Sequence, residues 1–166
     1  MLAETRRSHV AQNRDVAFRR YLRFTLYWNF VVMLSGPFVT PFFLDALGMT
    51  IVSASSSEVV LRWTIAKEKH YQPHGIVHGG AHCGVVETLA SVGAATWLGD
   101  RGQVVGVNNS TDFFRAVSEG RLTSTATPVH RGRSQQVWLV ETVDEDGRMV
   151  SRGQVRLQNL APATHS

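Results

Sequence analysis

Apolar residues recur at helical spacing between His78 and about Leu98. Val85 and Leu89 are separated by four residues, and similar spacings continue through the segment, which places the apolar side chains on one helix face. Gly99 follows where this pattern ends, as a glycine commonly does after a helix. The pattern predicts one long helix in the middle of the chain.

Most of the remaining chain alternates between apolar and polar residues and is rich in β-branched side chains, which is typical of strands. A short helix is predicted over residues 41–48, and the turn from Asp144 to Gly147 predicts a hairpin between the last two strands. The predicted strands cover residues 49–55, 57–67, 104–115, 121–130, 135–143 and 148–160. We expect an α+β fold over residues 35–162, with one long helix against an antiparallel sheet of about five strands.

The positive charge is concentrated near the start of the chain. The net charge is +4 at pH 7, and residues 1–23 hold six arginines against Glu4 and Asp15, so the other residues balance at 11 basic and 11 acidic. A neutral domain disfavours a nucleic-acid partner. The single cysteine, Cys83, excludes an internal disulfide and favours a reducing, cytoplasmic compartment.

Residues 1–34 form a basic and then apolar extension of unclear role. The apolar run over residues 24–34 is too short to span a bilayer, so no stable membrane insertion is expected. Arginines before an apolar run also occur in signal peptides, but no cleavage site of small residues follows. A peripheral helix and a start site at Met33 are alternative interpretations.

Glu87 lies inside the apolar part of the predicted helix. Buried helices rarely hold a lone carboxylate without a reason, because burying a charge is costly. Gly79 and Gly80 lie at the start of the same helix, where free N–H groups can stabilise a developing negative charge. Ser91 follows Glu87 by one turn on the same face. These features are typical of an acyl-transfer site.

The helix geometry separates the two halves of this site. A helix rises about 1.5 Å per residue, so Glu87 lies roughly 12 Å along the axis from Gly79. A second, antiparallel helix would bring Glu87 of one chain near Gly79 of another. If the two residues act together, we expect the site to lie across a two-fold dimer interface.

Histidines at positions 70, 74, 78 and 82 recur every four residues, a spacing that aligns metal ligands only on a helix. Pro73 and Gly75 prevent one continuous helix there, and no cysteine pair or second carboxylate completes a ligand set. No metal is expected.

The pattern of glutamine, His-Gly-Gly, glutamate and serine closely resembles the hot-dog-fold acyl-CoA thioesterases, especially the branch of the 1,4-dihydroxy-2-naphthoyl-CoA and 4-hydroxybenzoyl-CoA enzymes. The resemblance spans about residues 40–160. The matching residues are Gln72, His78, Gly79, Gly80, Glu87 and Ser91. Segments 105–115, 119–120 and 129–138 resemble those that hold the coenzyme A nucleotide.

The resemblance implies a role for each matching residue. The Gly79 N–H and the Gln72 amide would polarise the thioester carbonyl, and Glu87 of the other subunit would act as nucleophile or as general base. Ser91 would place the water or the carboxylate, and His78 would orient the substrate. The residues expected to bind substrate or coenzyme A are Gly80, Arg115, His130, Arg131, Gly132, Arg133 and Ser134.

The sequence therefore predicts a cofactor-free hydrolase of aromatic or medium-chain acyl-CoA thioesters, acting as a homodimer or homotetramer. A non-catalytic acyl-CoA-binding or regulatory module is the alternative, although such a module has no need of Glu87. A hot-dog dehydratase would require an Asp/His pair, and residues 70–86 contain no aspartate.

Overall fold

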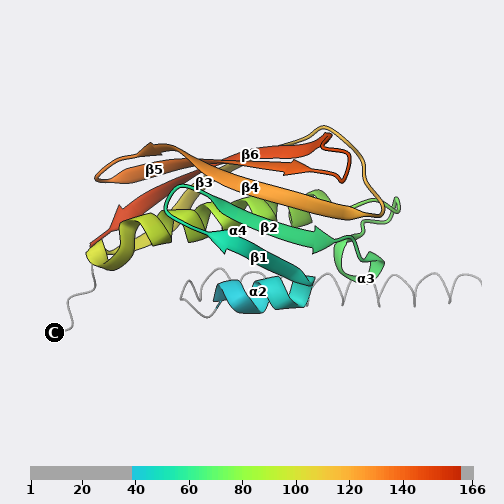
Figure 1. Ribbon diagram of the computed structural model, residues 1–166, viewed down its shortest axis with the longest axis horizontal. Helices are drawn as coiled ribbons and strands as arrows, with labels where there is room; N and C mark the ends of the chain where they lie inside the picture. The colour runs from blue at the N-terminus through green and yellow to red at the C-terminus, as the bar shows by residue number, and fades with distance from the viewer. Residues whose placement is uncertain (1–38, 162–166) are drawn as a thin grey trace, which may run out of the picture. The chain divides into compact units, whose positions relative to one another are not determined.

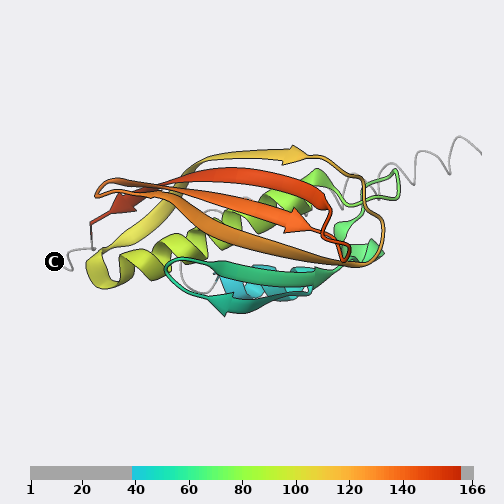
Figure 2. The same cartoon turned by 45° about the horizontal axis from the view of Figure 1, so that its top comes forward.

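The computed structural model describes residues 39–161 of the chain. The helix α4 (Gly79–Leu98) lies along one face of a six-stranded antiparallel sheet, which curves over it (Figure 1). The strand order is β1-β2-β4-β5-β6-β3, so β1 and β3 form the two edges. Figure 2 shows the same sheet arching across the helix from a second direction. The expected α+β arrangement is confirmed, and the predicted extension over residues 1–34 lies outside the described residues.

The remaining elements follow the order of the chain. A short helix precedes the first hairpin, and a second short helix leads into the loop before α4. The bounds are α2 Val39–Leu47, β1 Met49–Ala54, β2 Val59–Thr64, α3 Lys67–His70, a 3-10 turn Gly99–Arg101, β3 Gln103–Phe113, β4 Arg121–Arg131, β5 Gln135–Val143 and β6 Met149–Leu160.

The core lies between α4 and the sheet. Burial alternates along β5 and β6, so every second side chain faces the helix. Small residues allow the two layers to approach closely: Gly93 of α4 lies under the Trp138 ring, and Gly153 of β6 lies beside Val86. A Cβ atom at Gly93 would come within 2.5 Å of that ring. The side chains in this layer are therefore close-packed.

Two sequence predictions need correction. The sheet has six strands where about five were expected, and each of the six predicted strand ranges contributes one. The strand predicted over residues 57–67 ends at Thr64, because the backbone then turns into α3. Buried His70 stabilises this turn: its Nδ1 accepts a hydrogen bond from Ala66 N–H at 2.9 Å, and its Nε2 lies 2.9 Å from Leu47 O.

The predicted ends of other elements are confirmed. Gly48 follows α2 with φ +64°, and Gly99 follows α4 with φ +55°, the conformation that lets glycine terminate a helix. The predicted hairpin between β5 and β6 turns at Gly147, where φ is +76°. Within the part of the chain that is described, no helix is long and apolar enough to cross a membrane.

The edge strand β3 pairs with β6 along its whole length and shifts register by one residue between Gly106 and Asn108. Beyond this shift, Asn109, Thr111 and Phe113 pair with residues of β6 that are buried against α4. Their side chains therefore share the face of the sheet that covers the helix. The local shift in register decides which residues of β3 meet α4.

Candidate active site

The start of α4 leaves one backbone donor free. His78 is the N-cap: its Nδ1 accepts a hydrogen bond from Gly80 N–H at 2.8 Å, and its carbonyl oxygen accepts one from Ala81 N–H at 2.9 Å. Among residues 39–161, no atom accepts a hydrogen bond from Gly79 N–H. This donor lies at the positive end of the helix dipole, where it suits an oxyanion.

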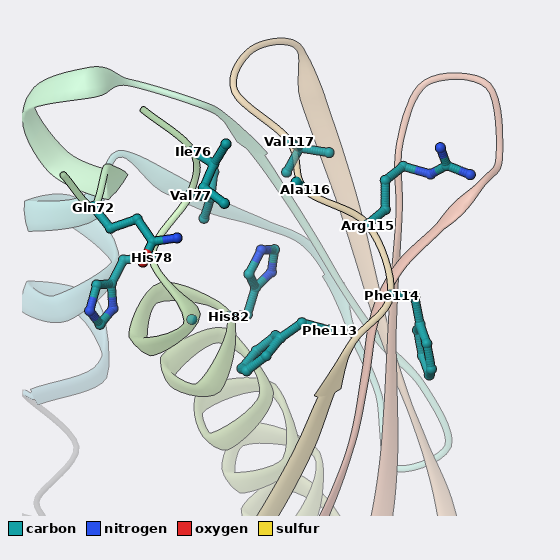
Figure 3. A pocket seen from close by; sticks show the side chains of 11 residues that line it. Gln72, Ile76, Val77, His78, His82, Phe113, Phe114, Arg115, Ala116 and Val117 are labelled. Atoms are coloured by element: carbon teal, nitrogen blue, oxygen red, sulfur yellow. The ribbon is translucent and has the colours of Figure 1, made fainter. Parts of the chain in front are cut away.

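A pocket of about 500 Å³ opens beside this donor. It lies between the loop before α4, the first turn of α4 and the segment after β3 (Figure 3). Its wall is mainly apolar and includes Ile76, Val77 and Val117. The polar and aromatic residues that line it include Gln72, His78, Gly79, His82, Phe113 and Arg115. The pocket thus combines the predicted oxyanion donors with space for an organic group.

Gln72 is placed in this pocket by a tight turn. Its N–H donates to Ile76 O at 2.9 Å, and its carbonyl oxygen accepts from Gly75 N–H at 3.0 Å. No hydrogen bond involves its side-chain amide within the described part of the chain. In Figure 3 this amide lies above the His78 ring. The amide is therefore available to a ligand.

Glu87 lies on α4 two turns beyond this pocket, partly buried beneath β3. Its Oε2 accepts a hydrogen bond from Asn109 Nδ2 at 3.0 Å, and its Oε1 lies directly over the Cα of Gly106, where a Cβ atom would overlap it. Burial raises the pKa of Glu87 above its usual value, and the hydrogen bond from Asn109 partly offsets that rise. A carboxyl group with a raised pKa in such a place is typical of a functional site.

Asn109 was not predicted as a site residue. It lies in a segment that the family resemblance assigned to the coenzyme A nucleotide, and nothing local to it marks a contact with the helix. Ser91, which was expected to orient the carboxylate, is half-buried one turn beyond Glu87. The described contacts join the carboxylate to Asn109 instead.

His82 was also missed, except as a possible metal ligand. It is 4% exposed, and its Nδ1 lies 3.2 Å from Ser151 Oγ. Its ring packs edge-on against Trp63, with centroids 5.6 Å apart, and lies 5.8 Å from the Phe113 ring. Burial lowers the pKa of His82 to about 4, so the ring is neutral at physiological pH.

The residues expected to bind coenzyme A fall into two places. Arg115 lines the pocket beside Gly79. The turn between β4 and β5 lies near the other end of α4, where Arg131 donates to Ser56 O at 2.7 Å and stacks over the Trp97 ring at 5.7 Å. The members of this exposed turn are His130, Arg131, Gly132, Arg133 and Ser134.

The single chain therefore keeps its predicted site residues apart. Gly79 and Glu87 belong to one continuous helix, so about 12 Å separate them along its axis. Trp97 of α4, whose ring contacts Arg131 of the turn between β4 and β5, lies ten residues beyond Glu87. Gln72, His78, Gly79 and Arg115 meet at one end of α4, and Glu87 does not reach them within the chain.

Proteins similar to this chain include thioester hydrolases. Residues 74–151 match the family model of the thioesterase superfamily. A Mycobacterium tuberculosis protein with a provisional esterase name is 54% identical over 97 residues, covering 57% of this chain and 69% of its own length. A Listeria monocytogenes 1,4-dihydroxy-2-naphthoyl-CoA hydrolase is 31% identical over 106 residues, which cover 64% of this chain and 85% of the hydrolase.

Solved structures agree with these matches. The crystal structure of AziG from S. sahachiroi superposes with a TM-score of 0.70 and 56% identity, covering 72% of this chain and 96% of that one. The chain belongs to the thioesterase superfamily and has the hot-dog fold. It is a thioester hydrolase.

Proposed function

We propose that the protein hydrolyses an aromatic or medium-chain acyl-CoA thioester to the free acid and coenzyme A. The unpartnered Gly79 N–H, at the head of α4 and beside a pocket of about 500 Å³, carries this proposal. The thioester carbonyl would accept hydrogen bonds from this N–H and from the Gln72 amide. As the carbonyl oxygen gains negative charge, the helix dipole and these donors would stabilise it.

Glu87 of a second copy would supply the attacking group. An antiparallel pairing of two α4 helices brings Glu87 of one chain towards Gly79 of the other. The exposed and half-buried residues on the same face of α4 as Glu87 support such a pairing, because they are small: Gly80, Cys83, Ser91 and Ala95. Solvent-facing helix stripes are normally charged, whereas small residues permit close approach of another helix. Ser91 of the same chain would place the water or the carboxylate.

The chemistry at Glu87 follows one of two balanced routes. As a nucleophile, the carboxylate forms an anhydride with the acyl carbon and expels the coenzyme A thiolate, and water then hydrolyses the anhydride. As a general base, it takes a proton from water while the water oxygen attacks the acyl carbon, and the C–S bond then breaks to release the coenzyme A thiolate, which takes up the proton. Both routes require the ionised carboxylate, and the raised pKa of Glu87 makes it more basic than an exposed one.

The same pairing gives coenzyme A two sets of cationic partners. The chain that supplies Glu87 would also supply Arg131 and Arg133, about 15 Å further along its helix axis. Arg115 would come from the chain that supplies Gly79. Guanidinium groups suit the phosphates of the nucleotide, because they bind phosphate oxygens in pairs. His130, Gly132 and Ser134 complete the proposed phosphate-binding turn.

The acyl group is assigned as aromatic or medium-chain from the pocket and from a relative. The pocket wall has Phe113, Ile76 and Val117, and the Listeria relative is named for an aromatic acyl-CoA. His78, which lines the pocket, would orient this group. The pocket is wide enough for a ring and mostly apolar, as an acyl-binding site requires.

The test compares thiol release from a panel of aromatic and straight-chain acyl-CoA thioesters by wild type, Glu87→Gln and Glu68→Gln. Glu68 lies on the exposed surface of α3 and serves as the matched control. We expect Glu87→Gln to lower kcat by at least about 10²-fold, since it removes the base or nucleophile, and Glu68→Gln to match wild type. Thioester binding with no thiol release by wild type would support the alternative, a non-catalytic acyl-CoA-binding or regulatory module.

A further inference from the structure

Three hydrogen bonds hold the Asn109 side chain of β3, and one of them reaches the carboxylate of Glu87. Thr111 Oγ1 donates to Asn109 Oδ1 at 2.7 Å. Asn109 Nδ2 then donates to Glu87 Oε2 at 3.0 Å and to Cys83 O at 3.2 Å. Because the backbone carbonyl of Cys83 can only accept a hydrogen bond, the amide nitrogen faces α4 and the amide oxygen faces Thr111. The two donors of this nitrogen are both used, one on the carboxylate and one on the helix backbone.

Two glycines make room for this arrangement. A Cβ atom at Gly106 would overlap Glu87 Oε1, and one at Gly153 would lie 2.7 Å from Thr111 Oγ1. Any larger residue at either position would displace the polar atom beside it. Oε1 therefore rests against bare backbone, and no described residue donates a hydrogen bond to it.

We propose that Asn109, held by Thr111, is a positioning residue that locks Glu87 Oε2 and leaves Oε1 as the reacting oxygen. This inference rests on the proposed function, in which Glu87 attacks the thioester or activates water. A carboxylate with one oxygen fixed loses its freedom to rotate, so the other oxygen is held in one place. A hydrogen bond to the ionised form also keeps more of the carboxylate charged at neutral pH.

The groups around Glu87 leave Asn109 as its main polar contact. On its own helix, Cys83 and His82 are the nearest titratable groups, and His82 is neutral at physiological pH. On β3, Asp112 pairs with Arg152 of β6 and so belongs to the opposite face of the sheet. The other charged side chains of β5 and β6, Glu141 and Arg156, share that opposite face. No charge among them contributes to the raised pKa of Glu87.

The test uses Asn109→Leu and Thr111→Val, with Asn108→Leu as the matched control. Asn108 is the neighbouring asparagine on β3, exposed and on the other face of the sheet. We expect Asn109→Leu to lower kcat by about 10–100-fold with little change in KM, because the reacting oxygen is no longer held. Thr111→Val should give a smaller loss, since it frees the amide to rotate without removing it.

The pH profile separates positioning from a structural role. Loss of the hydrogen bond removes an interaction that favours the charged carboxylate, so the acid limb of kcat/KM should move to higher pH in Asn109→Leu. Asn109→Asp, which places a second carboxylate beside the first, should move it further in the same direction. An unchanged kcat and acid limb in Asn109→Leu, relative to Asn108→Leu, would overturn the proposal.

A second measurement tests the contact between Asn109 and Glu87 separately from the proposed catalytic role of Glu87. Direct titration of the ¹³C-labelled Glu87 carboxyl by NMR, in wild type and in Asn109→Leu, does not depend on turnover. A higher pKa in the variant supports the contact, and an equal pKa contradicts it. Full activity of Glu87→Gln, with the NMR shift still present, would instead overturn the role of Glu87.

Discussion

At the scale of single residues, Gly79 combines two properties that no other residue type offers equally. It begins α4, and its N–H points out of the helix without an acceptor among the described residues. A Cβ atom there would lie 3.0 Å from the Phe113 ring, so the backbone of Gly79 can also be approached closely only because it lacks a side chain. The two properties can be separated by substitution.

We expect Gly79→Pro to lower kcat by about 10²–10³-fold, the usual effect of removing one oxyanion donor. Proline is favourable at the first position of a helix, and His78 already has the extended backbone that a following proline requires, with φ −68° and ψ 135°. Gly79→Ala is the control, because it adds the same Cβ atom but keeps the N–H. Equal losses in the two variants would show that crowding against Phe113, not the donor, matters.

We expect Glu87→Gln to increase the free energy of unfolding at neutral pH. Burial raises the pKa of Glu87 above the usual value of 4.5, so the folded state binds a proton more readily than the unfolded state does. Wild-type stability therefore falls as pH rises through this interval and stays lower above it. Urea unfolding at pH 7.5 and pH 4 measures the difference between the variant and wild type. The advantage of Glu87→Gln over wild type should shrink at pH 4.

At the scale of elements, the start of α4 is stabilised by a histidine N-cap. Asparagine, aspartate and serine are the common residues at this position, because a short side chain can accept a hydrogen bond from the first turn. His78 does the same with Nδ1, and it therefore has a structural role beside its proposed role in orienting substrate. The cap also explains why Gly79 N–H, and not Gly80 N–H, is left free.

We expect His78→Ala to lower the free energy of unfolding by about 0.5–2 kcal/mol, the usual cost of losing an N-cap. His78→Asn should recover most of that stability, because asparagine caps helices well. Thermal and urea unfolding measure both. If His78→Asn has the stability of wild type but a higher KM, the histidine also contacts substrate. If neither variant changes the free energy of unfolding, the capping role is wrong.

At the scale of the whole molecule, the long helix that keeps Gly79 and Glu87 about 12 Å apart makes a single chain insufficient for the proposed chemistry. A second copy would complete two sites at once, because a two-fold axis repeats every contact. The edge strand β3 carries exposed apolar side chains, with Val107 48% and Phe113 52% exposed. Burial of these side chains would add to the stability of such a dimer.

We expect a mixture of two inactive variants to regain activity. In a mixed dimer of Gly79→Pro and Glu87→Gln, one of the two sites combines the intact Gly79 of one chain with the intact Glu87 of the other. Random pairing should restore about a quarter of wild-type activity. Thiol release after co-expression of differently tagged chains measures this. Sites contained within one chain would give no recovery.

The sequence pattern predicted helices and strands better than it predicted contacts between residues far apart in the chain. The long helix, its glycine end and the hairpin at Gly147 were predicted, because each depends on neighbours within a few residues. The prediction that the second strand continues to residue 67 was wrong, because the backbone turns into α3, which depends on contacts of His70 with Ala66 and Leu47. The last of these lies 23 residues away, beyond the reach of any local pattern.

Gly79 and Glu87 were selected as site residues by their chemistry and spacing, and Gln72 by the resemblance to the thioesterase family. Their placement in a catalytic site stays a prediction, but the structure brings Gly79 and Gln72 together beside a pocket. Asn109 had no local signal, since polar residues are common on an edge strand. Its contact with Glu87 depends on the register of β3 against β6.

The sequence by itself determined the long helix, the antiparallel strands and the acid within an apolar segment, because side-chain periodicity and backbone preference act locally. Only the tertiary structure decided which residues of β3 cover that acid. Gly106 and Asn109 are an odd number of residues apart, and a regular strand would point them to opposite faces. The one-residue shift between Gly106 and Asn108 brings both to the helix side, where the glycine makes room for Oε1 and the asparagine holds Oε2.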